Sequence, residues 1–403
     1  MDEIGQGYLR LALRLDQHFQ GFVDAYFGPA SLKHEVLAEG LRPLVELRED
    51  AAQLQAAVQA AGYDAQREDF LARQVQAMLA VIRNLSGDPL DFGREVELYF
   101  DITPEMVDEA TFELAHAEID GLLPGRGSLV DRMNVWKKQM ELEAANVLPV
   151  FERALEETRH RTRGLFELPA SEDLSLDLVE DQPWSAYNWY LGKYHSRIDI
   201  NTDLPLRANS AVPLLAHEAY PGHHTEHALK EHYLYERGGR TEHAVQLLLA
   251  PECVLSEGIA DSGQDLIFDD ATLIAFLQDE LYPLAGLVNA DAERDVAMMH
   301  ATDRLRAVSG NGALLLHRDH RSPQEVQQYL EHYGLRTSEE ATHTLRFIQN
   351  PLFRSYIFNY SVGRRLVAPL LEGEDAAANF RRLLSEPFTP TQVRRWVEAS
   401  TAG

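Results

Sequence analysis

The spacing of apolar residues predicts helix after helix in the first part of the chain. A first apolar stripe covers residues 9–27 and stops at Gly28-Pro29. The proline-free run over residues 44–88 is rich in good helix formers, and Gly62 divides it into two predicted helices. The second of these ends at Ser86-Gly87, so the pattern predicts at least three helices before residue 90.

Polar residues that cap helices mark two further starts. Thr103 followed by Pro104 has the composition of a helix N-terminus, with a hydroxyl at the cap and proline at the first helical position. Ser128 predicts the start of a long helix that runs towards residue 163, with a kink or break at Pro149.

The pattern changes over residues 164–206, where side chains alternate as they do in strands. Residues 174–179 and 194–200 are the two predicted strands, and residues 201–205 form a turn cluster. Helical spacing then returns and continues to the end of the chain, so we expect a mainly α fold with a small β-sheet. The predicted organisation is a helical N-terminal lobe over 1–163 and a second lobe over 164–403, the latter made of the sheet (164–206), helices over 210–265 and C-terminal helices over 270–403. A single continuous domain is the alternative, because large helical bodies also reach this length.

Composition and charge limit the classes of partner. The chain has 403 residues, 45 % of them apolar, which excludes wholesale disorder. Its formal net charge of −27 repels phosphate backbones and anionic lipid heads, so we expect neither a nucleic-acid nor a membrane partner. The chain has one cysteine, Cys253, and therefore neither an intrachain disulfide nor a cysteine-based zinc cluster. With an acidic start and no apolar run of about 18 residues, the expected location is cytoplasmic.

Histidines and glutamates are concentrated at residues 216–227, Ala-His-Glu-Ala-Tyr-Pro-Gly-His-His-Thr-Glu-His. Four histidines and two glutamates in twelve positions are not explained by packing, and such a cluster favours a metal site. In the common motif His-Glu-x-x-His, two histidines four apart share a helical face and one ion, and the glutamate polarises a water.

The spacing here differs, because Pro221 stands four residues after His217. Histidines six or seven residues on would lie about 9–10.5 Å along the axis of a straight helix, too far to share an ion. We expect Pro221 and Gly222 to widen the turn and return His223 to the side of His217. His224 then points elsewhere, to support a ligand or contact substrate. A His223/His227 pair is the competing geometry.

A third ligand is expected on a later helix, in Ser256-Glu257-Gly258-Ile259-Ala260-Asp261. Glu257 is the candidate ligand. Asp261, four residues on and on the same face, is placed to accept a hydrogen bond from a ligating imidazole. Gly258 permits close approach of another helix.

His-Glu, a downstream Gly-His and then Glu-x-x-x-Asp resemble the gluzincin metallopeptidases. The form His-Glu-Ala-Tyr-Pro-Gly-His-His is similar to the bacterial family known as "domain of unknown function 885", which also carries a late Tyr-x-x-Gly, here Tyr360-Ser361-Val362-Gly363. The resemblance covers roughly residues 185–370. It implies a gluzincin-like multi-helix body, with the site in a cleft between two lobes beside the sheet. It also implies that the strand at 194–200 is an edge strand that binds extended substrate.

The same resemblance implies a role for each site residue. One Zn²⁺ is held by His217, His223 and Glu257, and Glu218 is the general base. Tyr360 is the favoured donor to the oxyanion, with Tyr356 as the second candidate. Arg364 is a candidate for holding a substrate carboxylate, as a carboxypeptidase or dipeptidase would require.

The predicted function is therefore a zinc-dependent hydrolase of peptide bonds, with a peptide or small molecule as its partner. Two alternatives stay open: a zinc hydrolase of a non-peptide amide or ester, and an inactive helical scaffold or metal-binding protein. Glu218 argues against the scaffold, because a structural metal site needs no base beside its ligand.

Overall fold

The computed structural model describes residues 2–182, 184–203 and 205–401. Helices account for 67 % of the chain and strands for 8 %, which confirms the mainly α prediction. Within the described residues, no helix has both the length and the apolar character needed to cross a membrane.

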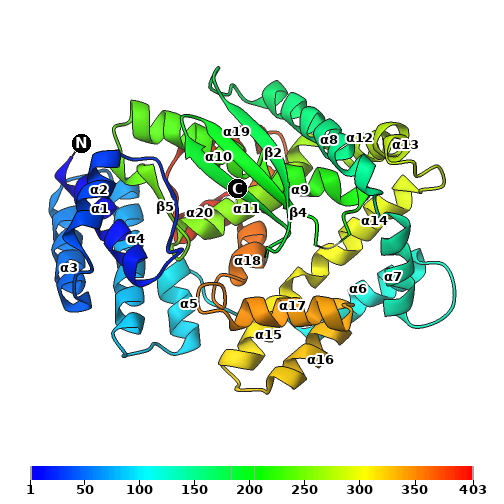
Figure 1. Ribbon diagram of the computed structural model, residues 1–403, viewed down its shortest axis with the longest axis horizontal. Coiled ribbons are helices and arrows are strands. Elements are labelled where there is room, and N and C mark those ends of the chain that lie inside the picture. The colour runs from blue at the N-terminus through cyan, green and yellow to red at the C-terminus, as the bar shows by residue number, and fades with distance from the viewer. Residues whose placement is uncertain (1, 183, 204, 402–403) are drawn as a thin grey trace.

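The helices follow one another along the whole chain (Figure 1). Those of the first half are α1 (Glu3–His18), α2 (Ala30–Glu39), α3 (Leu44–Ala60), α4 (Ala65–Leu85), α5 (Phe92–Phe100), α6 (Glu109–Leu122), α7 (Leu129–Gln139) and α8 (Ala144–Leu165). Those of the second half are α9 (Ala211–Glu218), α10 (His223–Lys230), α11 (Glu252–Ile267), α12 (Asp270–Phe276), α13 (Tyr282–Leu284), α14 (Ala292–Asp303), α15 (Val308–His317), α16 (Pro323–Gly334), α17 (Ser338–Gln349), α18 (Phe358–Val367), α19 (Ala376–Ser385) and α20 (Pro390–Thr401).

A three-stranded sheet interrupts the helices where the alternating pattern predicts it. Its order is β2 (Asp173–Val179), β4 (His195–Asn201), β3 (Ala186–Gly192), with β2 parallel and β3 antiparallel to β4. Both predicted strands are confirmed. The edge position expected for residues 194–200 is wrong, however, because β4 is hydrogen-bonded on both sides and the edge strands are β2 and β3.

Residues 23–27 form no helix, contrary to the prediction. Helix α1 ends at His18, and the strand β1 (Val23–Tyr26) pairs antiparallel with β5 (Val245–Leu247). Valine and the aromatic residues of this segment suit a strand as well as a helix, and a partner more than two hundred residues away decides the outcome.

Two helix boundaries also differ from prediction. Residues 101–108 are not helical, and α6 starts at Glu109 with Asp108 as its cap. Ser128 does cap α7, but the break falls at residues 140–143 rather than at Pro149. There the chain pairs with another segment, since the Leu142 backbone N–H donates to Leu206. Pro149 is the sixth residue of α8, and the helix continues through it to Leu165.

Two hydrophobic cores hold these elements together. The larger combines α1 to α6 with α11 and α15 to α20, so that Phe70 of α4 shares a core with Phe380 of α19. The smaller packs α8, α9 and β4 against α12 to α14, and includes Phe151 and Tyr282. Both cores take residues from both sides of residue 163, and the division at that position stays a prediction.

Candidate metal centre

The predicted metal-binding segment is a helix that stops and starts again. Helix α9 ends at Glu218 and α10 begins at His223, so the turn is a full interruption rather than a widened helix. A Cβ atom at Gly222 would lie 1.9 Å from the backbone oxygen of His217, which only glycine avoids. The turn brings the imidazoles of His217 and His223 together, with ring centroids 4.7 Å apart and planes at 88°.

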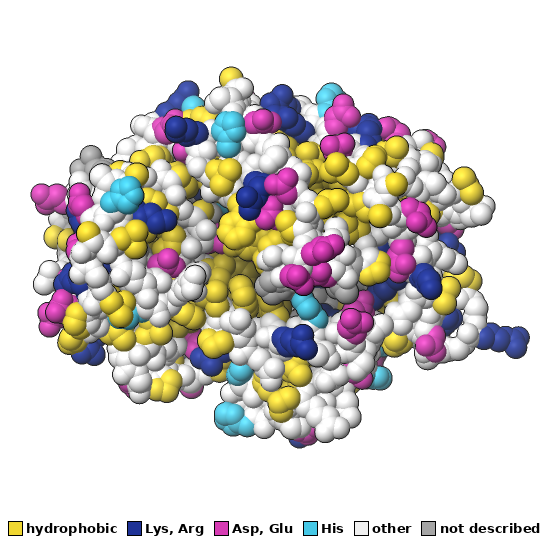
Figure 2. Space-filling model, in the orientation of Figure 1, with side chains coloured by type: hydrophobic (Ala, Val, Ile, Leu, Met, Phe, Trp, Pro, Cys, Tyr) yellow, Lys and Arg dark blue, Asp and Glu magenta, His cyan; other side chains and the backbone are white. Residues whose placement is uncertain are grey.

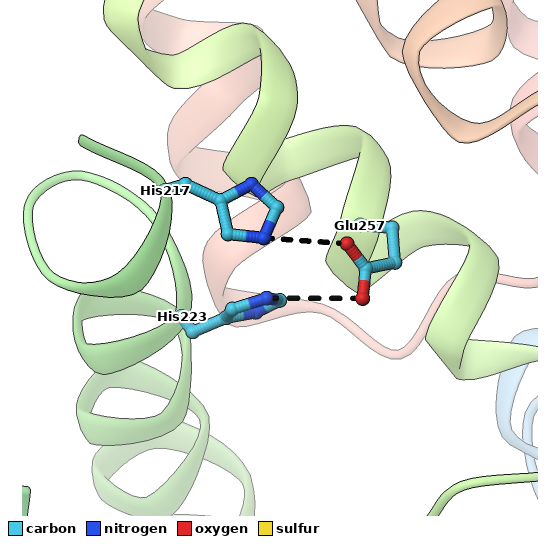
Figure 3. A group of neighbouring side chains, drawn as sticks. All are labelled: His217, His223 and Glu257. Atoms are coloured by element: carbon cyan, nitrogen blue, oxygen red, sulfur yellow. Dashed lines mark ion pairs between the residues drawn. The ribbon is translucent and has the colours of Figure 1, made fainter. Parts of the chain in front are cut away.

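Glu257 of α11 completes a cluster with the two imidazoles (Figure 3). Its Oε2 lies 3.4 Å from Nε2 of His217, and its Oε1 lies 3.9 Å from Nε2 of His223. One donor atom from each of the three residues lies within 4.8 Å of the others. Ligands about 2.0–2.1 Å from a tetrahedral zinc stand about 3.4 Å apart, so the residues present fit such an ion.

The outer nitrogen of each imidazole has its own partner. Nδ1 of His217 lies 3.1 Å from Oδ1 of Asp261, the partner that the sequence predicts. Nδ1 of His223 lies 3.1 Å from Oγ of Ser256. In both residues the Nε2 atom is therefore the one that faces Glu257.

The electrostatics of the cluster favour a cation. Burial raises the pKa of Glu257 to about 8, and its Oε2 is buried without a hydrogen-bond partner. Burial alone would lower the pKa of His217, but Asp261, Glu218 and Glu257 outweigh it and raise that pKa to about 9. Burial is the main cause for Glu257 and the neighbouring carboxylates are the cause for His217, and a divalent ion would favour the ionised carboxylate and the neutral imidazole.

Glu218 lies beside the triad and lines the same cavity. Burial raises its pKa, His217 opposes that rise, and the nearby Asp24 of β1 adds to it. The backbone oxygen of Glu218 accepts a hydrogen bond from Nδ2 of Asn188, 2.6 Å away, which ties the end of α9 to the edge strand β3. A carboxyl group with a raised pKa, next to a metal site, suits proton transfer.

The cavity has a volume of about 140 Å³ and joins segments from both ends of the chain. Besides the metal cluster and Glu218 it is lined by Asp24, Trp184, Ala186, Tyr187, Asn188, Glu226, His227, Lys230, Gln246, Leu247, Leu248, Glu252, Cys253, Ser256, Phe347, Phe353, Tyr356 and Tyr360. Figure 2 shows one face of the molecule hollowed near its centre, with hydrophobic side chains gathered in the hollow. Three residues of β3 contribute, so one of the two edge strands of the sheet borders the site.

The two candidate tyrosines have different surroundings. The hydroxyl of Tyr356 donates to Oε1 of Glu257 at 2.5 Å, so it holds a candidate metal ligand. Tyr360 lines the cavity with its ring 5.8 Å from that of Tyr356. Burial and the charge of Glu257 raise the pKa of Tyr360 well above 10, which keeps its hydroxyl protonated.

His224 is not brought to the metal cluster. It is fully buried, with Nδ1 2.8 Å from Oγ of Ser196 and Nε2 3.0 Å from Oε2 of Glu172. The helical turn of α10 directs His223 and His224 to different sides, and His224 therefore joins α10 to the sheet instead of supporting a ligand or contacting substrate.

Arg364 does not reach the cavity either, contrary to prediction. Its guanidinium bonds Asp265, Asp303 and the backbone oxygen of Asp261 in a separate polar pocket behind His217. Each of its three nitrogens has one of these partners. His227 lines the cavity with its ring stacked 5.9 Å from that of His223, but it lies outside the three-residue cluster.

Several residues of the site were not predicted, among them Asp24, Asn188 and Ser256. Asp24 lies in a segment whose pattern we interpreted as helix, and no motif marks it. Asn188 lies in β3, outside both predicted strands. Ser256 directly precedes Glu257, and no other feature of the sequence marks it as a site residue.

Comparison with known proteins gives similarity at the level of structure only. No family model matches the sequence. No curated protein matches it either. A solved structure described as "the putative lipoprotein from Colwellia psychrerythraea" aligns with a TM-score of 0.54 at 14 % identity, covering 92 % of this chain and 72 % of that one. Another, "a putative lipoprotein of unknown function from Shewanella oneidensis", aligns with a TM-score of 0.51 at 12 % identity, covering 91 % and 76 %. At these identities the likeness concerns the fold.

Proposed function

We propose that this protein is a zinc-dependent hydrolase that cleaves peptide bonds, and that it is a gluzincin-like enzyme resembling the "domain of unknown function 885" family. The observation that carries the proposal is the convergence of His217, His223 and Glu257 on one point of a cavity that Glu218 also lines. A purely structural metal site has no need of the buried carboxyl group of Glu218 or of an adjoining cavity.

His217, His223 and Glu257 would hold the ion. When bound, zinc supplies Lewis acidity that polarises a substrate carbonyl and acidifies a water. Glu218 accepts the proton of that water and passes it to the leaving amine. The hydroxyl of Tyr360 donates a hydrogen bond to the oxygen on which negative charge develops.

The edge strand β3 supports a peptide as the substrate. An extended segment pairs with an exposed strand edge through main-chain hydrogen bonds, which gives affinity with little sequence preference. Because Arg364 is occupied elsewhere, the proposal includes no preference for cleavage at a carboxyl terminus.

The test combines metal analysis with peptide assays on the wild type and on Glu218→Gln. We expect one zinc per chain in both proteins, and a loss of kcat of about 10²- to 10⁴-fold in the variant, because the proton acceptor is gone. Glu113→Gln, on the exposed side of α6, is the matched control and should retain full activity.

Absence of metal from the wild type would refute the proposal. The protein could instead bind one zinc per chain and hydrolyse simple amides or esters while cleaving no member of a peptide library. That result would show that its substrate is not a peptide.

A further inference from the structure

The imidazole of His223 is connected to a buried ion pair through a single hydroxyl group. Oγ of Ser256 lies 3.1 Å from Nδ1 of His223 and 2.5 Å from Oε2 of Glu226. The other oxygen of Glu226 bonds Nζ of Lys230 at 2.5 Å. Glu226 and Lys230 lie one turn apart on α10, the same helix as His223, whereas Ser256 comes from α11.

The directions of these hydrogen bonds follow from the available protons. A serine hydroxyl has one proton, and the Glu226 carboxylate, paired with Lys230, has none to give. The Ser256 proton therefore goes to Glu226, and the hydroxyl oxygen accepts from Nδ1–H of His223. This arrangement selects the tautomer in which Nε2 is unprotonated and directed at Glu257.

A direct contact with a carboxylate selects the same tautomer of His217. Its Nδ1 contacts Asp261 directly, and Asp261 pairs with Arg306 at 2.9 Å. Each imidazole is thus supported by a carboxylate that a cation neutralises. The carboxylate of Glu226 supports His223 indirectly, because the hydroxyl of Ser256 lies between them and contacts both.

We propose that Ser256 and Glu226 are positioning residues for His223, fixing its tautomer and ring orientation so that its Nε2 can bind the metal ion. The inference rests on the metal site of the proposed function, but not on the identity of the substrate. It assigns a function to a buried Glu226–Lys230 pair that the hydrolytic mechanism does not use.

The experiment measures the zinc dissociation constant of the full chain by competition with a chromophoric chelator, in the absence of substrate. Ser256→Ala should raise that constant about 10- to 100-fold, because His223 loses the partner of its Nδ1–H. Ser256→Thr retains a hydroxyl and should bind zinc nearly as the wild type does.

Ser262→Ala is the matched control. Ser262 lies on the same helix, is fully buried, and its Oγ has no hydrogen-bond partner, so its loss should leave zinc affinity unchanged. Circular dichroism and thermal unfolding of the metal-free proteins check that all variants fold.

Equal zinc affinity in Ser256→Ala and the wild type would overturn the inference. A loss of zinc affinity in Ser262→Ala as large as that in Ser256→Ala would also overturn it. These results leave the hydrolase proposal standing. A wild type that binds no zinc would refute both, whereas zinc binding with the expected Ser256 effect but no peptide cleavage would refute only the peptidase.

Discussion

Two tyrosines four residues apart have separate tasks in the candidate site. Tyr356 donates to Glu257, while Tyr360 faces the cavity that Glu218 lines. The first contacts a candidate metal ligand, and the second borders the space in which the proposed substrate would lie. Zinc affinity and turnover should therefore respond to different substitutions.

We predict that Tyr360→Phe lowers kcat by about 10²- to 10³-fold with little change in zinc affinity, because one donor to the developing oxyanion is lost. Tyr356→Phe should weaken zinc binding by about 10- to 150-fold, since Glu257 loses a hydrogen bond worth about 1.5–3 kcal/mol. Steady-state kinetics and zinc competition on both variants separate these effects. The assignment is contradicted if Tyr360→Phe retains full turnover.

At the residue scale, the sequence predicted those positions that local chemistry determines. A proline–glycine pair after His217 sets the turn, and it returned His223 to the side of its partner. The neighbouring His224 has the same chemistry, but its surroundings are the sheet and Glu172, which no local pattern reveals. Arg364 also has three acidic or carbonyl partners that its sequence neighbours do not indicate.

The geometry of the site depends on the contact between helices α11 and α18. A Cβ atom at Gly258 would lie 2.4 Å from the backbone oxygen of Gly363, so the two helices touch backbone to backbone. The close approach predicted for Gly258 is confirmed. Glu257 precedes this contact on one helix, and Tyr360 is three residues before it on the other, so the packing sets their separation.

We predict that Gly258→Ala destabilises the protein by about 1–3 kcal/mol and weakens zinc binding, because the helices must move apart to admit a methyl group. Gly121→Ala is the control: Gly121 lies in α6 with nothing near its Cβ position, and the change should stabilise by about 0.4–1 kcal/mol. Urea unfolding measures both. Two variants of equal stability would show that the contact tolerates a side chain.

Element boundaries were predicted where the signal is local. Gly62 separates α3 from α4, and Ser128 caps α7, because turn and cap chemistry act within a few residues. The strand β1 and the break at residues 140–143 depend on pairing with residues 245–247 and 206–208. Such partners lie far along the chain, and periodicity contains no information about them.

At the scale of the whole molecule, one buried carboxylate joins three parts of the fold. Glu172, just before β2, accepts hydrogen bonds from Arg159 and Arg163 of α8, from the Tyr220 hydroxyl and from His224 of α10. Burial alone would raise the pKa of Glu172, but these donors outweigh it and hold the pKa far below its ordinary value. The network therefore links the sheet to α8, to α10 and to the turn between α9 and α10.

The depressed pKa gives a signed prediction for acid stability. Because the folded pKa lies below the unfolded one, the stabilisation is fully present above about pH 4.5 and is lost as pH falls towards the folded pKa. Glu172→Gln should lower the free energy of unfolding by about 3 kcal/mol at pH 7, and by less at pH 3.

Urea unfolding at pH 7 and pH 3 measures the effect, with the exposed Glu167→Gln as control. A difference between wild type and Glu172→Gln that stays constant with pH would contradict the assigned pKa.

The cavity wall also has a consequence for synthesis of the chain on the ribosome. Its lining extends from Asp24 to Tyr360, so a nascent polypeptide that has emerged through Glu257 has all three proposed metal ligands but lacks Phe347, Phe353 and both tyrosines. Under the proposed function, the residues that would bind zinc are therefore synthesised before the wall that would enclose a substrate. The proposed hydrolysis would then begin only when translation is almost complete, which would protect the growing chain and its neighbours from premature cleavage.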